Sequence, residues 1–291
     1  MPRSPVAGLL VMSVFTLASE AGAQPAAGRH DVRPFITDDA RVVGGGLAQV
    51  ESWFRWDEES SQQWLLAALG PTEWLELTVG GVAGQDRTGE SGQFTYALPL
   101  LQAKALLRPY APGAAPGAAV VAGTFLPGGE GVLVPPGYGL FVFGIVSQSF
   151  GAGDRVLLHG NLGVNHQWLD PEDATVLTWG LGTQVRTVGG LHAVAELFSG
   201  DPYVPGSGTA VQVGARQFLS ESLQLDATLG HGIAGSPSLP TWWTVGVRWV
   251  LPRLWGAEPT GVRAPGGYAR PAPVGPEHGG RGPRLGGRRG W

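Results

Sequence analysis

The sequence predicts an all-β fold, a transmembrane antiparallel up-and-down β-barrel of about 12 strands. The first observation is the stretch from Val156 to Trp168, where small or polar residues alternate with apolar ones over thirteen positions. A strand in a soluble sheet usually has about five or six residues, whereas a tilted strand that crosses a bilayer needs about nine to eleven. An apolar face toward lipid and a polar face toward a lumen explain the pattern.

The second observation is the start of the chain. Arg3 precedes an apolar run from Val6 to Ala18, and Ala21-Gly22-Ala23 follows it. A positive start, a short apolar run and an A-x-A site are typical of a secretory signal peptide, so we expect residues 1–23 to be removed. No other stretch has the eighteen or so apolar residues of a membrane helix. We therefore expect an exported protein that resides in the outer membrane through its strands.

Composition is the third observation. Of the 291 residues, 43% are hydrophobic and only 14% are charged, and the 48 glycines and 24 prolines argue against a helical protein. The chain has no cysteine, which excludes a disulfide scaffold and a thiolate metal site.

Residues 24–46 have no periodic pattern and precede the first strand. They contain RPFITDDARVV from Arg33 to Val43, in which Arg33, Asp38, Asp39 and Arg41 flank an apolar pair. The favoured interpretation is a periplasmic lead-in. The alternative is a plug that folds into the barrel, where these four charges would meet partners in the lumen.

The barrel is expected over residues 47–251. Most of its strands alternate as Val156 to Trp168 does, but 118–125 and 140–149 are nearly apolar on both faces, which leaves their orientation open. The expected strands are 47–56, 62–69, 73–82, 95–107, 118–125, 140–149, 156–168, 175–186, 192–198, 209–218, 223–231 and 242–251.

The connections between these strands alternate in length, apart from a long inner one at 108–117. Outer-membrane barrels pair short periplasmic turns with longer outer loops, and an even strand number returns both ends to the periplasm. Trp56, Trp168 and Trp243 fall at outer strand ends and Trp249 at an inner end, as aromatic girdles require. A soluble secreted β-sandwich is the competing fold.

Segments distributed along the chain carry a resemblance: RPFITDDARVV, QVESW, EWLELTVGG, PLLQAK, GTFLPGG, PPGYG, SQSFG, TWGLGTQVRT and SGDPYVPG. Together they resemble the family labelled MetA-pathway of phenol degradation. The resemblance runs from Arg33 to about Leu251 and implies an outer-membrane β-barrel that acts as a transporter and is linked by name to aromatic breakdown. The last strand also resembles an assembly signal, with Thr244, Gly246, Trp249 and Leu251. It departs from the usual pattern because the chain continues to Trp291.

The alternation also predicts which charged side chains face the lumen. Buried charges must be paired or hydrated. The favoured interpretation is a salt-bridge network that fills a narrow barrel, and the alternative is a constriction that admits small or apolar solutes and screens ions. The predicted lumen residues are Glu51, Arg55, Glu76, Lys104, His159, Arg186, Glu196, Arg216, Asp226 and Arg248.

An outer-membrane lipid-modifying enzyme is a second class of hypothesis. His159, His166, His192 and His231 are available, but no GxSxG or HExxH spacing is present, and His166 is on the lipid-facing side of its strand. No cluster of metal ligands occurs in the sequence, so no metal and no cofactor are expected. A passive structural or adhesion barrel that uses its outer loops is a third class.

From Pro252 to Trp291 the chain is rich in proline, glycine and arginine, with seven arginines against two glutamates, and is expected to be a disordered tail. It lacks interleaved aromatic residues, so no nucleic-acid partner is expected. The expected partners are outer-membrane lipids, the barrel-assembly machinery and a small solute. The predicted function is a passive channel for small, perhaps aromatic, molecules.

Overall fold

The computed structural model describes residues 36–88, 92–109, 114–151, 155–201, 204–235 and 239–256, without the side chains of 204–207. The predicted signal peptide, Arg33 and most of the expected tail lie outside these residues. No helix in the described part is long and apolar enough to cross a bilayer.

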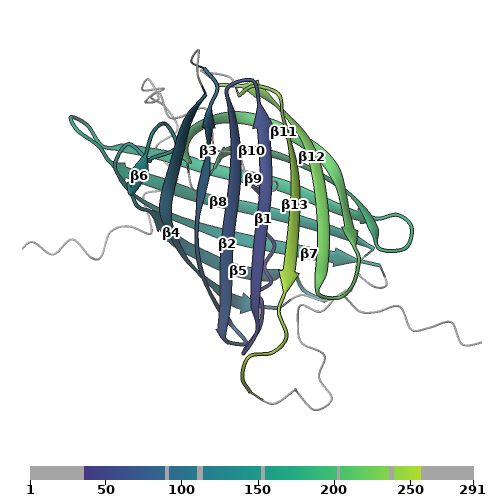
Figure 1. Cartoon of the computed structure of the whole chain (residues 1–291). Helices are drawn as coiled ribbons and strands as arrows, with labels where there is room; N and C mark the ends of the chain where they lie inside the picture. Colours follow the sequence, from purple (N-terminus) through teal and green to yellow (C-terminus); the bar gives the residue numbers. More distant parts are fainter. Residues whose placement is uncertain are drawn as a thin grey trace, which may run out of the picture.

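Twelve strands form one closed antiparallel ring (Figure 1). Each strand pairs with its neighbours in the chain, and β1 pairs with β13 to close the ring. The short β6 (Gly129–Glu130) pairs with β4 beside it. The ring contains β1 (Ala48–Asp57), β2 (Ser60–Thr72), β3 (Leu75–Asp86), β4 (Gln93–Arg108), β5 (Gly117–Phe125), β7 (Tyr138–Phe150), β8 (Val156–Trp168), β9 (Ala174–Arg186), β10 (Leu191–Asp201), β11 (Val204–Phe218), β12 (Leu223–Ala234) and β13 (Trp242–Val250).

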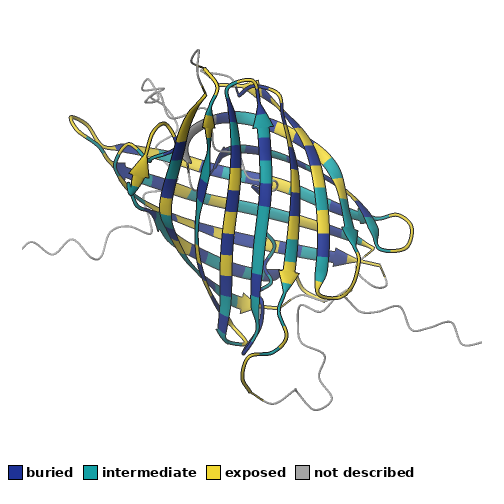
Figure 2. Ribbon diagram, in the orientation of Figure 1, coloured by how far each residue is buried: buried dark blue, intermediate teal, exposed yellow. Residues whose placement is uncertain are grey.

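This architecture confirms the predicted fold class and the strand count, and it excludes two stacked sheets. The thirteen residues from Val156 to Trp168 are one uninterrupted strand, paired along its length with β7 and β9. Exposed and buried residues alternate along the strands (Figure 2). Leu162, for example, is 59% exposed, while Leu157 on the other face is buried. An exposed apolar belt is costly in water and favourable in lipid, so the outer surface suits a membrane.

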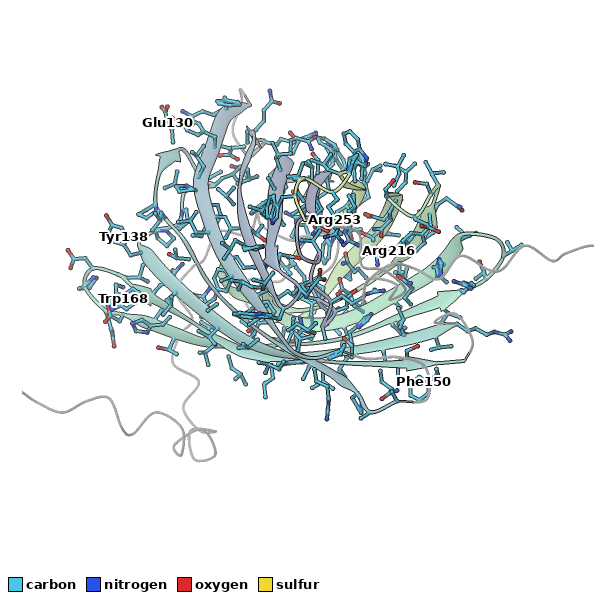
Figure 3. All side chains as sticks on the ribbon, turned by 90° about the horizontal axis from the view of Figure 1, so that it is seen from below. Glu130, Tyr138, Phe150, Trp168, Arg216 and Arg253 are labelled. Atoms are coloured by element: carbon cyan, nitrogen blue, oxygen red, sulfur yellow. The ribbon has the colours of Figure 1, made fainter. Side chains whose placement is uncertain are left out.

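Aromatic residues lie near both ends of the wall. Tyr138 and Trp168 lie together at one end and Phe150 at the other, and all three are exposed (Figure 3). Below, the end at which β1 begins and β13 ends is called the terminal end, and the opposite end is called the distal end.

The expected alternation of long and short connections is wrong in detail. At the distal end, β1 and β2 are separated only by residues 58–59, and β10 and β11 only by residues 202–203. Strand pairing continues beyond the apolar stretch, as in Asp201 opposite Val204. Hydrogen bonds between strands do not require an apolar face, so a prediction from hydropathy makes these strands too short at the distal end.

The barrel interior is also less uniformly polar than expected. Inward side chains of β1 to β7 form an apolar cluster that includes Trp53, Trp64, Phe141 and Phe143, and Leu133 from the β5–β7 connection packs into it. The stretches that looked apolar on both faces are the reason, because their inward residues belong to this cluster. One sector of the lumen is therefore filled with apolar side chains.

Candidate functional site

A polar cavity of about 170 Å³ lies inside the barrel. Its lining comes from the strands and from the segment Thr37 to Arg41, so the candidate site is a space between the wall and an internal segment. Among the lining residues, five carboxylates face four cationic side chains. These charged residues are Asp38, Asp39, Arg41, Glu51, Glu76, Lys104, Arg216, Asp226 and Arg248.

The internal segment consists of Ile36 to Gly46 and is called the plug below. It is deeply buried in the barrel, where Ile36 and Ala40 are almost inaccessible. Of the two alternatives for the residues before β1, the structure shows a segment inside the lumen for 36–46.

The distal part of the plug is bound by Glu196 of β10. Its carboxylate accepts hydrogen bonds from the backbone N–H groups of Ile36 (3.0 Å) and Thr37 (2.8 Å), and from the Thr37 hydroxyl. Gln212 donates a further bond to the same carboxylate. Ile36 also packs in an apolar cluster with Phe198 and Trp242.

Two glycines of β9 make room for the plug. A Cβ atom on Gly180 would lie 2.4 Å from Cγ2 of Thr37, and one on Gly182 would lie 2.6 Å from its Oγ1. Atoms this close would clash, so only glycine leaves the space that Thr37 occupies. The Gly-x-Gly of the β9 polar face is therefore a seat for the plug.

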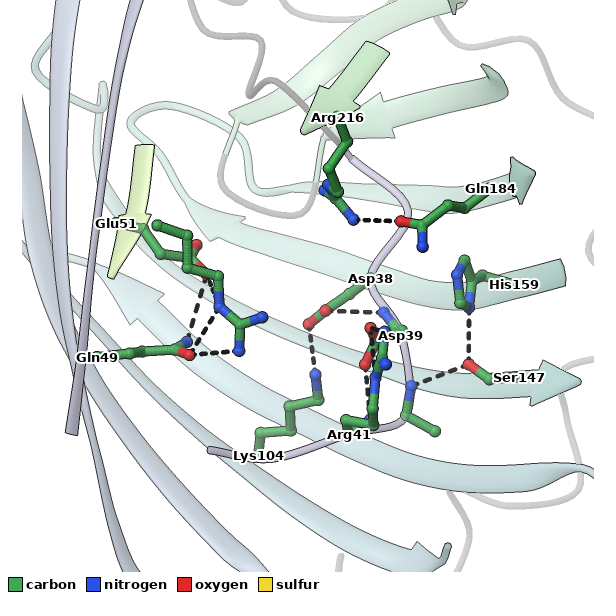
Figure 4. Close-up of polar contacts among 12 residues, drawn as sticks. Asp38, Asp39, Arg41, Gln49, Glu51, Lys104, Ser147, His159, Gln184 and Arg216 are labelled. Carbon is green, nitrogen blue, oxygen red and sulfur yellow. Dashed lines mark hydrogen bonds and ion pairs between the residues drawn. The ribbon is translucent and has the colours of Figure 1, made fainter. Parts of the chain in front are cut away.

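Ion pairs hold the middle of the plug (Figure 4). The Lys104 ammonium lies 3.0 Å from the Asp38 carboxylate, and the Arg41 guanidinium lies 2.5 Å from that of Asp39. Burial by itself raises the pKa of the Asp39 carboxyl, but the charges of Arg41 and Lys104 outweigh it and hold this pKa well below its usual range. Asp39 thus remains ionised inside the barrel.

Wall side chains also bind the plug backbone. The Ala40 N–H donates to the Ser147 hydroxyl (2.9 Å), and the Val43 N–H donates to the Glu76 carboxylate (2.7 Å). With its amide assigned from the hydrogen-bond network, Asn161 accepts from the Asp38 N–H at 2.7 Å. Wall side chains thus provide the hydrogen bonds that water would otherwise make to the backbone of the plug.

The contact between Ser147 and His159 bears on the enzyme hypothesis. The Ser147 hydroxyl lies 2.9 Å from Nδ1 of His159, beneath the plug and fully buried. This position is inside the barrel, away from the lipid-facing surface on which a lipid-modifying enzyme would act. His166 is half-buried and contacts Thr175, His231 is exposed and contacts Thr241, and His192 contacts the Gly190 carbonyl. No metal-binding cluster occurs among the residues that the structure describes.

The C-terminal end of the described chain closes over the base of the plug. Arg253 donates to the Gly45 carbonyl, and the Leu254 N–H donates to the Gly46 carbonyl at 2.8 Å. Gly46 has a φ of +72°, a conformation that favours glycine, and its N–H donates to the Gly70 carbonyl at 2.8 Å. Residues just beyond the last strand therefore contact the plug, which their composition did not predict.

The remaining predicted lumen residues separate into two groups. Arg248 lies 3.2 Å from Glu51 and also donates to Gln49, while Arg216 donates to Gln184 at 2.9 Å. All of these line the cavity, as does Asp226. Arg55 lies elsewhere, fully buried, with its guanidinium 2.7 Å from Asp57 and 5.5 Å from the Trp242 ring. Arg186, at the end of β9, does not line the cavity.

The site also contains neutral residues, which the predicted set of charges and one histidine leaves out. Four of them, Ser147, Asn161, Gln184 and Gln212, lie on strands, where an inward position was the available signal. The fifth, Thr37, lies in the plug, which has no periodic pattern.

The residues of the proposed assembly signal differ in exposure. Thr244 is buried and lies 2.6 Å from the Thr228 hydroxyl, whereas Trp249 is 48% exposed. The Leu251 N–H donates to the Ala48 carbonyl beyond the end of β13.

Comparisons with known proteins place this geometry in context. A family model described as Uncharacterised conserved protein UCP029691 matches residues 14–250. The COG4313 outer membrane channel from Pseudomonas putida F1 is 12% identical, with a TM-score of 0.56, and the match covers 76% of this chain and 100% of that one. The KdgM porin is 9% identical, with a TM-score of 0.47, over 69% of this chain and 98% of that one. No curated protein matches the chain in sequence. At these identities, the likeness to the COG4313 channel establishes an outer-membrane barrel fold.

Proposed function

Because the chain belongs to the family described as Uncharacterised conserved protein UCP029691, whose description states no activity, we propose a function from its geometry. The protein is a passive channel that lets small molecules, with a preference for apolar and aromatic ones, cross the outer membrane. The observation that carries this proposal is the cavity of about 170 Å³ that remains beside the plug.

Two further features support the preference for apolar solutes. The apolar cluster around Trp53 and Trp64 adjoins the cavity, because Trp53 and Leu66 belong to both. Such a surface favours an apolar solute, whereas the ion pairs around the plug present fixed charges to a passing ion. The resemblance to the MetA-pathway of phenol degradation family adds aromatic compounds to the expected solutes. The COG4313 protein, whose solved structure has a similar fold, is an outer membrane channel.

The same proposal assigns a role to the other segments of the chain. Residues 1–23 direct export as a signal peptide, and the last strand presents Thr244, Gly246, Trp249 and Leu251 to the barrel-assembly machinery. The exposed apolar belt contacts outer-membrane lipids. The terminal end of the barrel faces the periplasm.

Flux measurements test the channel. The full-length protein is reconstituted into liposomes, and the entry of phenol, benzoate, glucose and potassium is compared with that into empty vesicles. We expect phenol to enter faster than in empty vesicles, with a smaller gain for benzoate. Equal rates for every solute with and without protein would overturn the proposal.

A filled structural or adhesion barrel is the second candidate, and the apolar side chains that fill one sector of the lumen favour it. It predicts no flux together with high resistance to unfolding. Lipid hydrolysis or acyl transfer by the purified protein, lost in His159→Ala, would instead support the enzyme.

A further inference from the structure

Polar side chains of several strands bind the plug. They include Glu76 of β3, Lys104 of β4, Ser147 of β7, Asn161 of β8 and Glu196 of β10. The cavity is also lined by the stretch of wall that β11, β12, β13 and β1 form.

Inward residues of that wall form a continuous row. Trp53 of β1 pairs with Gly246 of β13, Gly246 pairs with Asp226 of β12, and Asp226 pairs with Arg216 of β11. Arg216 extends the row by its hydrogen bond to Gln184 of β9. A Cβ on Gly246 would lie 2.6 Å from Oδ1 of Asp226 and 3.2 Å from Cβ of Trp53. The absence of a Cβ at Gly246 thus leaves room for the side chains of Asp226 and Trp53. This row, together with Gln224, is called the wall site.

The wall site contains buried polar atoms that have no hydrogen-bond partner among the described residues. Two are donors, the indole Nε1 of Trp53 and the amide Nε2 of Gln184, and two are acceptors, Oε1 of Gln224 and Oδ1 of Asp226. Trp53, Gln184 and Gln224 are only 4%, 2% and 5% exposed. All four residues line the same cavity. Buried polar groups normally have partners, so four orphans around one cavity indicate a bound molecule there.

The chemistry of these atoms limits the occupant. A hydroxyl group accepts from an indole or amide N–H and donates to a carbonyl or carboxylate oxygen, so it can serve both kinds of orphan. A free anion or cation is less suitable, because five lining carboxylates nearly balance four lining cations and three of these cations already form ion pairs with carboxylates. Leu66 and Ala68 give the cavity an apolar part next to Trp53.

We propose that the wall site binds a small uncharged solute that carries a hydroxyl group on an apolar ring or chain. Trp53 and Gln184 donate to the hydroxyl oxygen, Gln224 or Asp226 accepts the hydrogen bond that the hydroxyl donates, and the apolar part lies against Leu66 and Ala68. This binding site deepens the proposed channel function, on which it rests for the route by which the solute arrives.

Binding calorimetry tests the wall site directly. The full-length protein in lipid nanodiscs is titrated with phenol, cyclohexanol, toluene and benzoate, and the heats from empty nanodiscs are subtracted. We expect saturable binding of phenol and cyclohexanol, with weaker binding of toluene, which lacks the hydroxyl, and of benzoate, which is charged. Trp53→Phe keeps an aromatic ring beside Trp64 and removes the five-membered ring with its N–H. Trp53→Phe and Gln184→Leu should each weaken phenol binding roughly three- to tenfold, the effect of one neutral hydrogen bond.

Trp243→Phe is the matched control, because Trp243 is exposed on the outer face and should leave binding unchanged. No saturable heat for any solute would mean that the cavity holds water only and would overturn the site. Equal binding by the wild type, Trp53→Phe and Gln184→Leu would also overturn it. Binding without liposome flux would contradict the channel and leave the wall site standing. Flux without binding would overturn the wall site and leave the channel standing.

Discussion

The buried carboxylate of Glu196 accepts hydrogen bonds from four neutral donors. Three of the four donors, the N–H groups of Ile36 and Thr37 and the Thr37 hydroxyl, belong to the plug. A buried anion is costly unless hydrogen bonds replace its hydration. If the plug left, the carboxylate would lose most of these bonds. A single wall residue thus contributes strongly to keeping the plug in place.

Glu196→Gln tests this contribution. The glutamine keeps the size but turns one acceptor oxygen into a donor, which then faces the N–H of Ile36 or Thr37. We expect the plug to be destabilised by about 1–3 kcal/mol relative to the barrel. Hydrogen exchange followed by mass spectrometry should show roughly tenfold or greater acceleration in the peptide that contains residues 36–46. The exposed Glu130→Gln is the control, and unchanged exchange in Glu196→Gln would contradict the argument.

At the scale of the element, each strand serves two environments through its two faces. In β8, Leu158, Leu162 and Val164 are exposed on the outside, while Leu157, Asn165 and Gln167 are buried inside. The plug follows a different rule, since it has no regular pairing of its own. It is held by side chains from several strands and by the space at Gly180 and Gly182.

Leu162→Arg tests the outer face. Leu162 lies at the middle of β8 and is 59% exposed, so we expect it near the centre of the bilayer. An arginine on the lipid face at that depth costs about 2–4 kcal/mol. Denaturant unfolding in lipid vesicles should show this loss, whereas Leu162→Ala should lose less. Equal stability of the arginine variant and the wild type would place Leu162 outside the bilayer.

Gly182→Val tests the seat of the plug. Valine favours a strand, but its Cβ would lie 2.6 Å from the Thr37 hydroxyl oxygen and would clash with it. We expect the barrel to fold, the plug to leave its seat and the ion conductance in planar bilayers to rise above that of the wild type.

Gly160→Val is the matched control for this substitution. It places the same side chain in β8, where the new Cβ meets only Leu181 at 3.7 Å, an ordinary contact. Its conductance should equal that of the wild type. A rise in Gly160→Val as large as that in Gly182→Val would show that valine perturbs the wall rather than the plug.

At the scale of the whole molecule, twelve strands form a cylinder without free edges, and the even number brings its two ends together. Ala48 and Val250 lie at the same end, where Leu254 also binds Gly46. Because barrels of this class keep both chain ends in the periplasm, we expect the terminal end to face inward.

Cysteine labelling on intact cells tests this orientation, and the chain has no cysteine of its own. Glu172→Cys lies in the β8–β9 connection at the distal end, and Glu221→Cys lies in the β11–β12 connection at the terminal end; both positions are exposed. A membrane-impermeant maleimide should label only Glu172→Cys until the cells are lysed. Labelling of Glu221→Cys alone would show that the terminal end faces the outside of the cell.

Alternation along the chain by itself predicted twelve strands and a closed ring, and it predicted the two faces of every strand except 118–125 and 140–149. Period two is a local property, since neighbouring side chains in a strand must point to opposite sides. The same parity placed Glu51, Glu76, Lys104 and Arg248 among the inward side chains. Only the tertiary structure decided what they meet.

The plug, the apolar sector and the wall site depend on residues far apart in the chain. Thr37 meets Glu196 across 159 positions, and Gln49 meets Arg248 across 199. No local pattern encodes such pairs, because parity states which side a residue faces and leaves open what lies opposite. Trp53 was recognisably inward, but its unpartnered N–H became visible only once the ring had closed around the plug.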